Sequence, residues 1–79
     1  MMNLSVGDRV NLAILKEALR QPLVLDSEYS TIIVNPEHVK AIEHGKKFKF
    51  YLLLLTDDTV ISIHVDPEGK ITEIKMDYG

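Results

Sequence analysis

The sequence predicts an α+β fold, in which one N-terminal helix packs on a four- or five-stranded, predominantly antiparallel sheet that ends in a β-meander. An apolar stripe at helical spacing lies near the start of the chain, and short apolar runs separated by turn residues fill the rest. The chain has 79 residues and no cysteine, so it is long enough for one small core and has no disulfide to stabilise it. We therefore expect residues 1–79 to form a single domain.

The helix is expected from about Val6 to Arg20. Ser5 followed by Asp8 resembles a capping box, and Pro22 ends the helix because the residue before a proline avoids the α conformation. Residues 6–10 also suit a turn that enters a small β-barrel, but the poverty of β-branched residues after them favours a helix. Three leucines share one face of this helix, at Leu12, Leu15 and Leu19.

Two short strands, residues 23–25 and 31–34, are expected to form a hairpin across the polar stretch 26–30. An Asn-Pro-Glu sequence follows, which suits the start of a helix. The apolar residues after it do not alternate cleanly. Residues 36–43 therefore fit either a short helix or a strand, and the sequence does not separate the two.

The meander is expected from Lys47 to Met76. Its first strand alternates polar and apolar residues and then becomes apolar on both faces through four leucines, 52–55. The second strand, 60–65, alternates again, and the Asp-Pro-Glu-Gly sequence at 66–69 has the residue preferences of a type I turn. We place one side of each element inside the protein, which gives a core of Leu12, Leu15, Leu19, Ile32, Val34, Phe50, Leu52, Leu54, Ile61, Ile63 and Ile74.

The four consecutive leucines require cover on both faces of their strand, and one helix covers only one face. The second cover is either the 23–34 hairpin folded across the sheet as a small barrel or the same surface of another copy. Self-association is a usual remedy for a core this small. The sequence therefore favours a homodimer, with Leu53 and Leu55 at its interface.

Charge and hydropathy limit the partners and the compartment. The net charge is −3, which is the wrong sign for a protein that neutralises the phosphates of a duplex. The N-terminal residues lack the cationic and apolar regions of a secretory signal, and no apolar run approaches the roughly 20 residues of a membrane helix. We expect a cytoplasmic protein without a membrane partner.

No catalytic, metal or cofactor site is expected. Ser62, His64 and Asp66 supply the residue types of a nucleophile, base and orienter, but side chains two apart on a strand project in parallel. His38 and His44 are six residues apart, which suits no usual zinc spacing. The isolated glycines form no phosphate-binding loop.

One segment interleaves lysines with aromatic residues, as surfaces that bind single-stranded nucleic acid do. Its candidate binding residues are Lys46, Lys47, Lys49 and Tyr51. The segment has no arginine, and its two phenylalanines suit a core equally well.

The sequence thus predicts a small non-enzymatic protein-interaction module, a regulator or inhibitor that binds a partner protein or itself through a sheet surface or edge. The absence of catalytic and cofactor signals leads to this expectation. The alternative is a nucleic-acid-binding β domain that uses the lysine and aromatic residues of segment 46–51.

Overall fold

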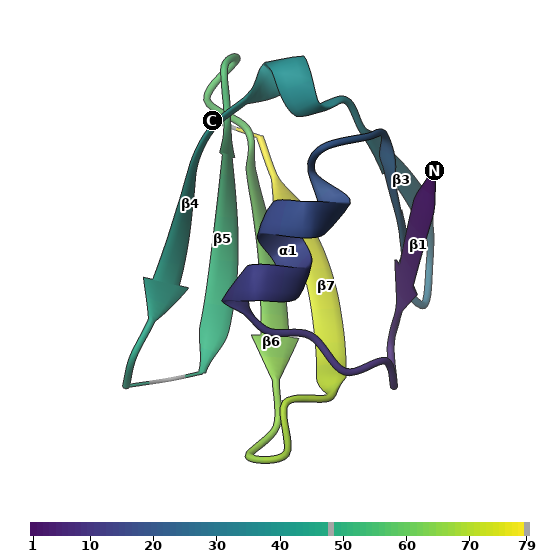
Figure 1. Cartoon of the computed structure of the whole chain (residues 1–79), viewed down its shortest axis with the longest axis vertical. Helices are drawn as coiled ribbons and strands as arrows, with labels where there is room; N and C mark the ends of the chain where they lie inside the picture. Colours follow the sequence, from purple (N-terminus) through teal and green to yellow (C-terminus); the bar gives the residue numbers. More distant parts are fainter. Residues whose placement is uncertain (48, 79) are drawn as a thin grey trace.

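The computed structural model describes residues 1–47 and 49–78, and in these residues it contains one α-helix, one 3-10 turn and seven strands (Figure 1). Their order is β1 (Met2–Ser5), α1 (Leu12–Ala18), β2 (Leu23–Asp26), β3 (Thr31–Val34), η1 (Pro36–His38), β4 (Val39–Gly45), β5 (Phe50–Leu55), β6 (Val60–Val65) and β7 (Ile71–Asp77). The α+β class is confirmed, and the strands divide between two sheets.

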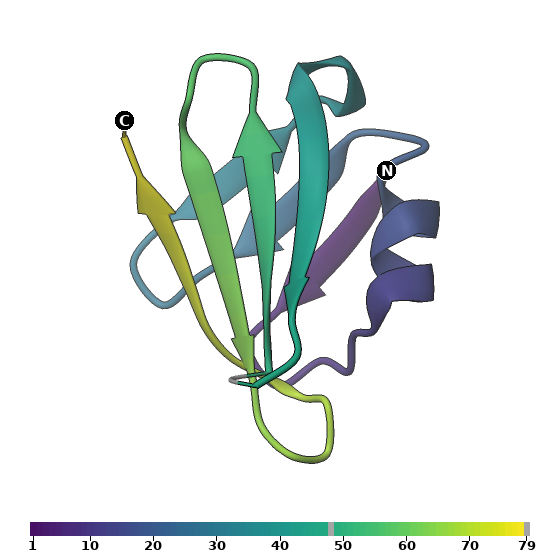
Figure 2. The ribbon, with the colours of Figure 1, turned by 90° about the vertical axis from the view of Figure 1, so that its left-hand side faces the viewer.

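The strands form a three-stranded sheet, β1-β2-β3, and a four-stranded sheet, β4-β5-β6-β7. β1 and β2 are parallel and are joined through α1, whereas every other pair is antiparallel. Figure 2 shows the four-stranded sheet in front, the three-stranded sheet crossing behind it and α1 beside the β4 edge. The core therefore lies between two sheets, and both the 23–34 hairpin and the C-terminal meander are confirmed.

The helix is shorter than expected and is not the first element. It begins after Asn11, whose side-chain oxygen accepts a hydrogen bond of 2.8 Å from the Ile14 N–H. Ser5 and Asp8 instead close a turn, since the Ser5 N–H donates to the Asp8 carboxylate at 2.8 Å. Gly7 adopts a φ of +98° in this turn, which a helix excludes. The expected capping box is thus the turn that ends β1. Residues 6–7 form a turn, as in the alternative interpretation, but the strands form two sheets and not a barrel.

The segment 36–43 contains both structures that its sequence suited. Pro36–His38 form a single 3-10 turn with proline at its start, and β4 begins directly after it at Val39. The register of β4 against β5 shifts between Val39 and Ala41, at a β-bulge or similar irregularity. Such an irregularity disturbs the alternation of apolar residues from which a strand is predicted.

The inner side of β5 is opposite to the predicted one. Tyr51 and Leu53 are buried in the core, whereas Phe50, Leu52 and Leu54 point away from it and are half-buried. A strand that is apolar on both faces carries no alternation, so its own sequence does not fix which face is inside. Pairing with β6 fixes it, because residues opposite each other share a face: Leu53 lies opposite Ile61 and Tyr51 opposite Ile63.

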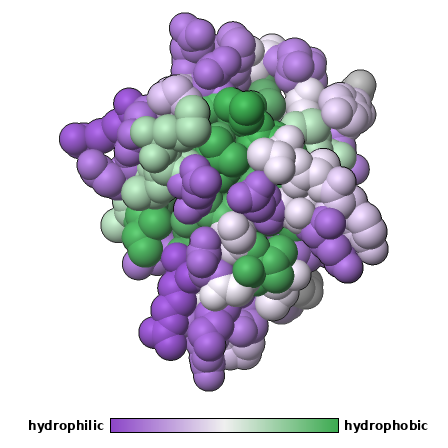
Figure 3. Space-filling view, turned by 90° about the vertical axis from the view of Figure 1, so that its right-hand side faces the viewer, coloured by the Kyte–Doolittle hydropathy of each residue, from purple (hydrophilic) through white to green (hydrophobic). Residues whose placement is uncertain are grey.

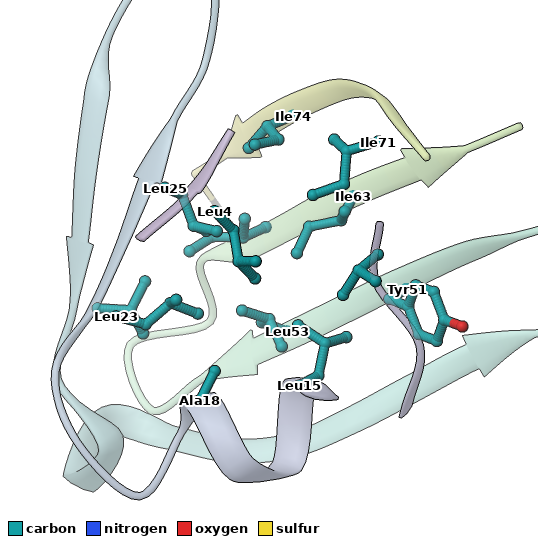
Figure 4. Close-up of a cluster of buried hydrophobic side chains, with 13 residues drawn as sticks. Leu4, Leu15, Ala18, Leu23, Leu25, Tyr51, Leu53, Ile63, Ile71 and Ile74 are labelled. Atoms are coloured by element: carbon teal, nitrogen blue, oxygen red, sulfur yellow. The ribbon is translucent and has the colours of Figure 1, made fainter. Parts of the chain in front are cut away.

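The chain itself covers the inner side of β5. Figure 4 shows Leu15 and Ala18 of α1 close to Leu53, and Leu23 of β2 across the core from it. The hairpin does fold across the sheet, but it covers the same inner side as α1, so neither of the two expected covers lies on the outer side of β5. Leu53 is fully buried and Leu55 is half-buried against the same cluster. This placement corrects the predicted interface, because a buried Leu53 has no surface to offer a second copy.

Among the described residues, no helix is long and apolar enough to cross a membrane.

Candidate functional site

Most of the predicted binding residues come together at one end of the sandwich. Lys46, Lys49 and Tyr51 line a hollow of about 500 Å³ between the β4–β5 turn, the β6–β7 turn and the segment before α1. The fold adds Arg9 and His44 to them. We call this site the basic hollow. Lys47 is on the same turn but does not line it.

The basic hollow has an excess of unpaired positive charge. Within residues 1–47 and 49–78, Arg9, Lys46 and Lys49 have no carboxylate within 4.0 Å. The two acids of the hollow are already engaged. Glu68 lies 3.4 Å from the Lys70 ammonium, and the Asp66 carboxylate accepts backbone N–H bonds from Lys70 at 3.0 Å and from Glu68 at 2.9 Å.

Tyr51, the predicted aromatic binding residue, is buried, so its ring is not open to a ligand in solvent. Tyr51 lies in the core cluster, and the exposed ring above it belongs to His44. The two rings are stacked, with centroids 4.4 Å apart and planes 11° apart. A ring that stacks on this pair from solvent therefore contacts His44, which is not among the four predicted binding residues.

The residue types considered for catalysis are not brought together. Ser62 and His64 lie on the side of β6 that faces away from the core, opposite Leu52 and Phe50. The Asp66 carboxylate is held by backbone N–H groups of its own turn. Among the described residues, no group of three histidines or acids is placed to hold a metal ion.

The outer face of the four-stranded sheet carries an apolar stripe. We define this outer face by the side chains that point away from the core, namely Ala41, Glu43, Phe50, Leu52, Leu54, Val60, Ser62, His64, Glu73, Lys75 and Asp77. The Phe50 ring lies over Gly45, where an added Cβ would approach its atoms to 2.5 Å. The same ring is 6.0 Å from the His64 ring.

A second apolar surface follows β7, which is an edge strand. Two hollows of about 500 Å³ each lie between β7 and the β2–β3 hairpin, and both contact Ile74. We call this surface the β7 groove. Of the five large hydrophobic side chains that are exposed among the described residues, four line it: Val6 (47% exposed), Tyr29 (91%), Ile33 (64%) and Tyr78 (81%).

The backbone of β7 is open toward this groove. At its start, the Ile71 N–H donates to the Asp8 carbonyl and the Ile71 carbonyl accepts from the Gly7 N–H, both at 2.8 Å. From residue 72 to residue 77, β7 pairs with β6 and with no other described strand. Half of the N–H and C=O groups of an edge strand point away from its sheet and can pair with an added strand.

The three-stranded sheet adds apolar surface beside the β7 groove. Ile33 lies next to Val24 and Asn3 in a row on the outer side of this sheet. Figure 3, which views the molecule from that side, shows several hydrophobic patches across the face, with polar residues between and around them.

Comparison of the chain with protein-family models, with curated proteins and with solved structures finds no match. The three surfaces differ in chemistry. The basic hollow suits an anion, the outer face suits another flat apolar surface, and the β7 groove suits an extended chain.

Proposed function

We propose that this protein is a non-enzymatic interaction module that binds an extended segment of a partner protein by adding it to β7 as a further strand. The gathering of Val6, Tyr29, Ile33 and Tyr78 along one groove is the observation that carries the proposal. Large exposed apolar side chains are costly in water when they cluster, so such a patch marks an interaction site.

Strand addition uses the two parts of the groove for different purposes. The open backbone of β7 provides affinity that is independent of side chains, because it pairs with any extended segment. The apolar residues on the hairpin side, Tyr29 and Ile33, contact alternate side chains of that segment. Specificity is therefore expected to come from every second residue of the partner.

The charges of the groove define the partner further. Asp26, Glu28 and Glu73 line it together with one cation, Lys75, which lies 3.5 Å from Glu73. A segment with a basic residue beside its apolar positions complements this excess of acid. The groove carries three acids against one cation, so the same groove of a second copy does not complement its charge, and we assign the groove to a different chain.

The test is a selection of linear peptides from a displayed library against the folded protein. We expect selected peptides to alternate apolar residues and to include a lysine or arginine. A Tyr29→Ser, Ile33→Thr double variant should bind them at least tenfold more weakly, whereas Leu52→Thr, on the outer face, should bind them normally. Equal binding by wild type and the double variant would refute the proposal.

A second copy is a separate candidate partner, which the outer face favours. One row of this face runs Glu43, Leu52, Ser62, Lys75 from one edge to the other. A two-fold axis parallel to the strands would place Glu43 opposite Lys75 of the other copy, and the reverse, around an apolar centre. The face is only roughly 20 Å wide, from four strands at about 4.8 Å, so this dimer would be weak and would form only at high concentration.

Light scattering across a concentration series tests the dimer. The expected result is a mass that rises with concentration and that Leu52→Lys returns to the monomer value without unfolding. A monomer at every concentration removes this candidate and leaves the proposal for the β7 groove unaffected.

A cytoplasmic location stays a prediction from the N-terminal sequence.

A further inference from the structure

We infer that the basic hollow binds a nucleotide unit, with the phosphate among Arg9, Lys46 and Lys49 and the base stacked on His44. This site is at the β4–β5 turn, whereas the β7 groove lies along the opposite edge of the four-stranded sheet. The inference therefore does not depend on the proposed protein partner.

The phosphate position follows from the distribution of ion pairs. Four cations of the chain have a carboxylate within 4.0 Å, in the pairs Arg20–Glu17, Lys40–Asp58, Lys70–Glu68 and Lys75–Glu73. The cations without such a partner among the described residues concentrate at this end, with Arg9, Lys46 and Lys49 around one hollow. These three side chains are exposed, and an anion that binds among them is attracted by all three charges.

The hollow keeps a net positive charge, because three cations line it against two acids, and both acids are directed to other partners. Asp66 directs its carboxylate oxygen to the N–H groups of Glu68 and Lys70, and the Glu68 carboxylate pairs with Lys70. Arginine and lysine from separate segments then surround an anion from several directions. A phosphate, with several acceptor oxygens, suits such an arrangement better than a single carboxylate does.

The base position follows from the stacked rings. Tyr51 is buried and fixed by the core, and it holds the His44 ring parallel to its own at 4.4 Å. One face of the His44 ring is thus occupied, and the residue remains exposed. A nucleobase on the other face would continue the stack as a third layer, a contact that every base can make.

The size of the hollow limits the ligand. About 500 Å³ is within the usual range for small-ligand sites and accommodates one nucleotide. A duplex hides the faces of its bases, so it would leave the His44 stack unused. A free nucleotide and one unit of a single strand present the same phosphate and base, and the experiment must distinguish them.

The test is an NMR titration of the full chain with adenosine 5′-monophosphate, with adenosine and with inorganic phosphate. We expect the nucleotide to shift the amides of residues 9–11, 44–47, 49–51, 66, 68 and 69 and to bind more tightly than either fragment. Its affinity should fall as salt increases. A fluorescent ten-residue oligothymidylate that binds more tightly than the mononucleotide would identify a single strand as the source, and weaker binding would identify a free nucleotide.

Variants separate the two parts of the site. Lys46→Gln with Lys49→Asn should weaken nucleotide binding at least tenfold, and asparagine tolerates the φ of 49° at residue 49. His44→Ala should weaken binding of the nucleotide but not of phosphate. Lys16→Gln, at a lysine of α1 that has no carboxylate within 4.0 Å among the described residues, is the control and should change nothing. Absence of shifts with both the nucleotide and the oligothymidylate at low salt, or equal loss in the control, would overturn the inference.

Discussion

At the scale of single residues, Gly45 shows how a missing side chain shapes the outer face. Its Cβ position is filled by the Phe50 ring, at 2.5 Å. Gly45→Ala should displace that ring and destabilise the protein by about 0.5–1.5 kcal/mol, the usual cost of forcing a side chain off its rotamer, because the ring is half-buried and can turn aside.

A double-mutant cycle measured by urea unfolding checks this explanation. In a Phe50→Leu background, the same Gly45→Ala change should cost clearly less, because the displaced group is smaller and flexible. An unchanged cost would mean that the backbone of Gly45, and not the ring, sets the requirement.

Asp66 gives a prediction about acid stability. The backbone N–H of Lys70 first, and then that of Glu68, lower the pKa of this carboxyl below its ordinary value of 3.8. A group with a lowered folded pKa contributes stability above its unfolded pKa and loses it as the pH falls through the folded value. Urea unfolding midpoints should therefore show Asp66→Asn less stable than wild type at pH 7, with the difference shrinking below about pH 4.

The control for Asp66 is Asp77→Asn, at an exposed acid near the end of β7. If the two variants behave alike, the hydrogen bonds of the Asp66 turn do not contribute to acid stability.

The residues of the basic hollow were only partly predictable. Lys46, Lys49 and Tyr51 lie close together in sequence, so the composition of this segment alone predicts a binding surface. Arg9 is distant in sequence, and only the packing of the two sheets brings it to the hollow. The sequence shows His44 only as a histidine without a usual zinc spacing, and its position seven residues before Tyr51 becomes a stack only through the β4–β5 register.

At the scale of secondary-structure elements, α1 depends strongly on its cap because it has only seven residues. A helix this short has little intrinsic stability. Asn11→Ala should cost about 1 kcal/mol, the typical value for an N-cap. Thermal unfolding measures the change, with Asn3→Ala on β1 as an exposed asparagine control. No loss at Asn11 would show that packing alone holds the helix.

The two sides of β5 give the sharpest stability contrast. Leu53→Lys should prevent folding, because it places a charge in the fully buried core. Leu52→Lys should leave a folded protein, because the Leu52 side chain points to the outer face. Circular dichroism and amide NMR spectra of the two variants distinguish these outcomes. If Leu53→Lys folded and Leu52→Lys did not, Leu52 would lie on the inner side of β5, as the sequence predicts.

The elements that the sequence predicted correctly have strong local signals. The alternation in β6 and the Asp-Pro-Glu-Gly turn after it fix the last hairpin, and the polar residues 26–30 fix the first one. The start of the helix was predicted too early, because a Ser and an Asp three apart satisfy both a cap and a turn. The pairing of β1 with β2 decides that Ser5 and Asp8 form a turn, and this pairing joins segments that are distant in sequence.

At the scale of the whole molecule, the sandwich explains why the leucine-rich strand needs no second copy for its inner side. The three-stranded sheet and α1 together cover it, and the outer side is left half-buried. The β7 groove arises from the same arrangement, because the hairpin turn around Tyr29 lies beside Thr72–Lys75. No sequence pattern marks this groove, since it joins segments more than 40 residues apart.

Amide hydrogen exchange along β7, with and without a peptide selected for binding, tests the proposed strand addition most directly. The account predicts slower exchange at alternate residues between 72 and 77, where N–H groups now open to solvent would be paired. It predicts little change in β4, the opposite edge of the same sheet. Protection in β4, or none in β7 at saturating peptide, would contradict the account.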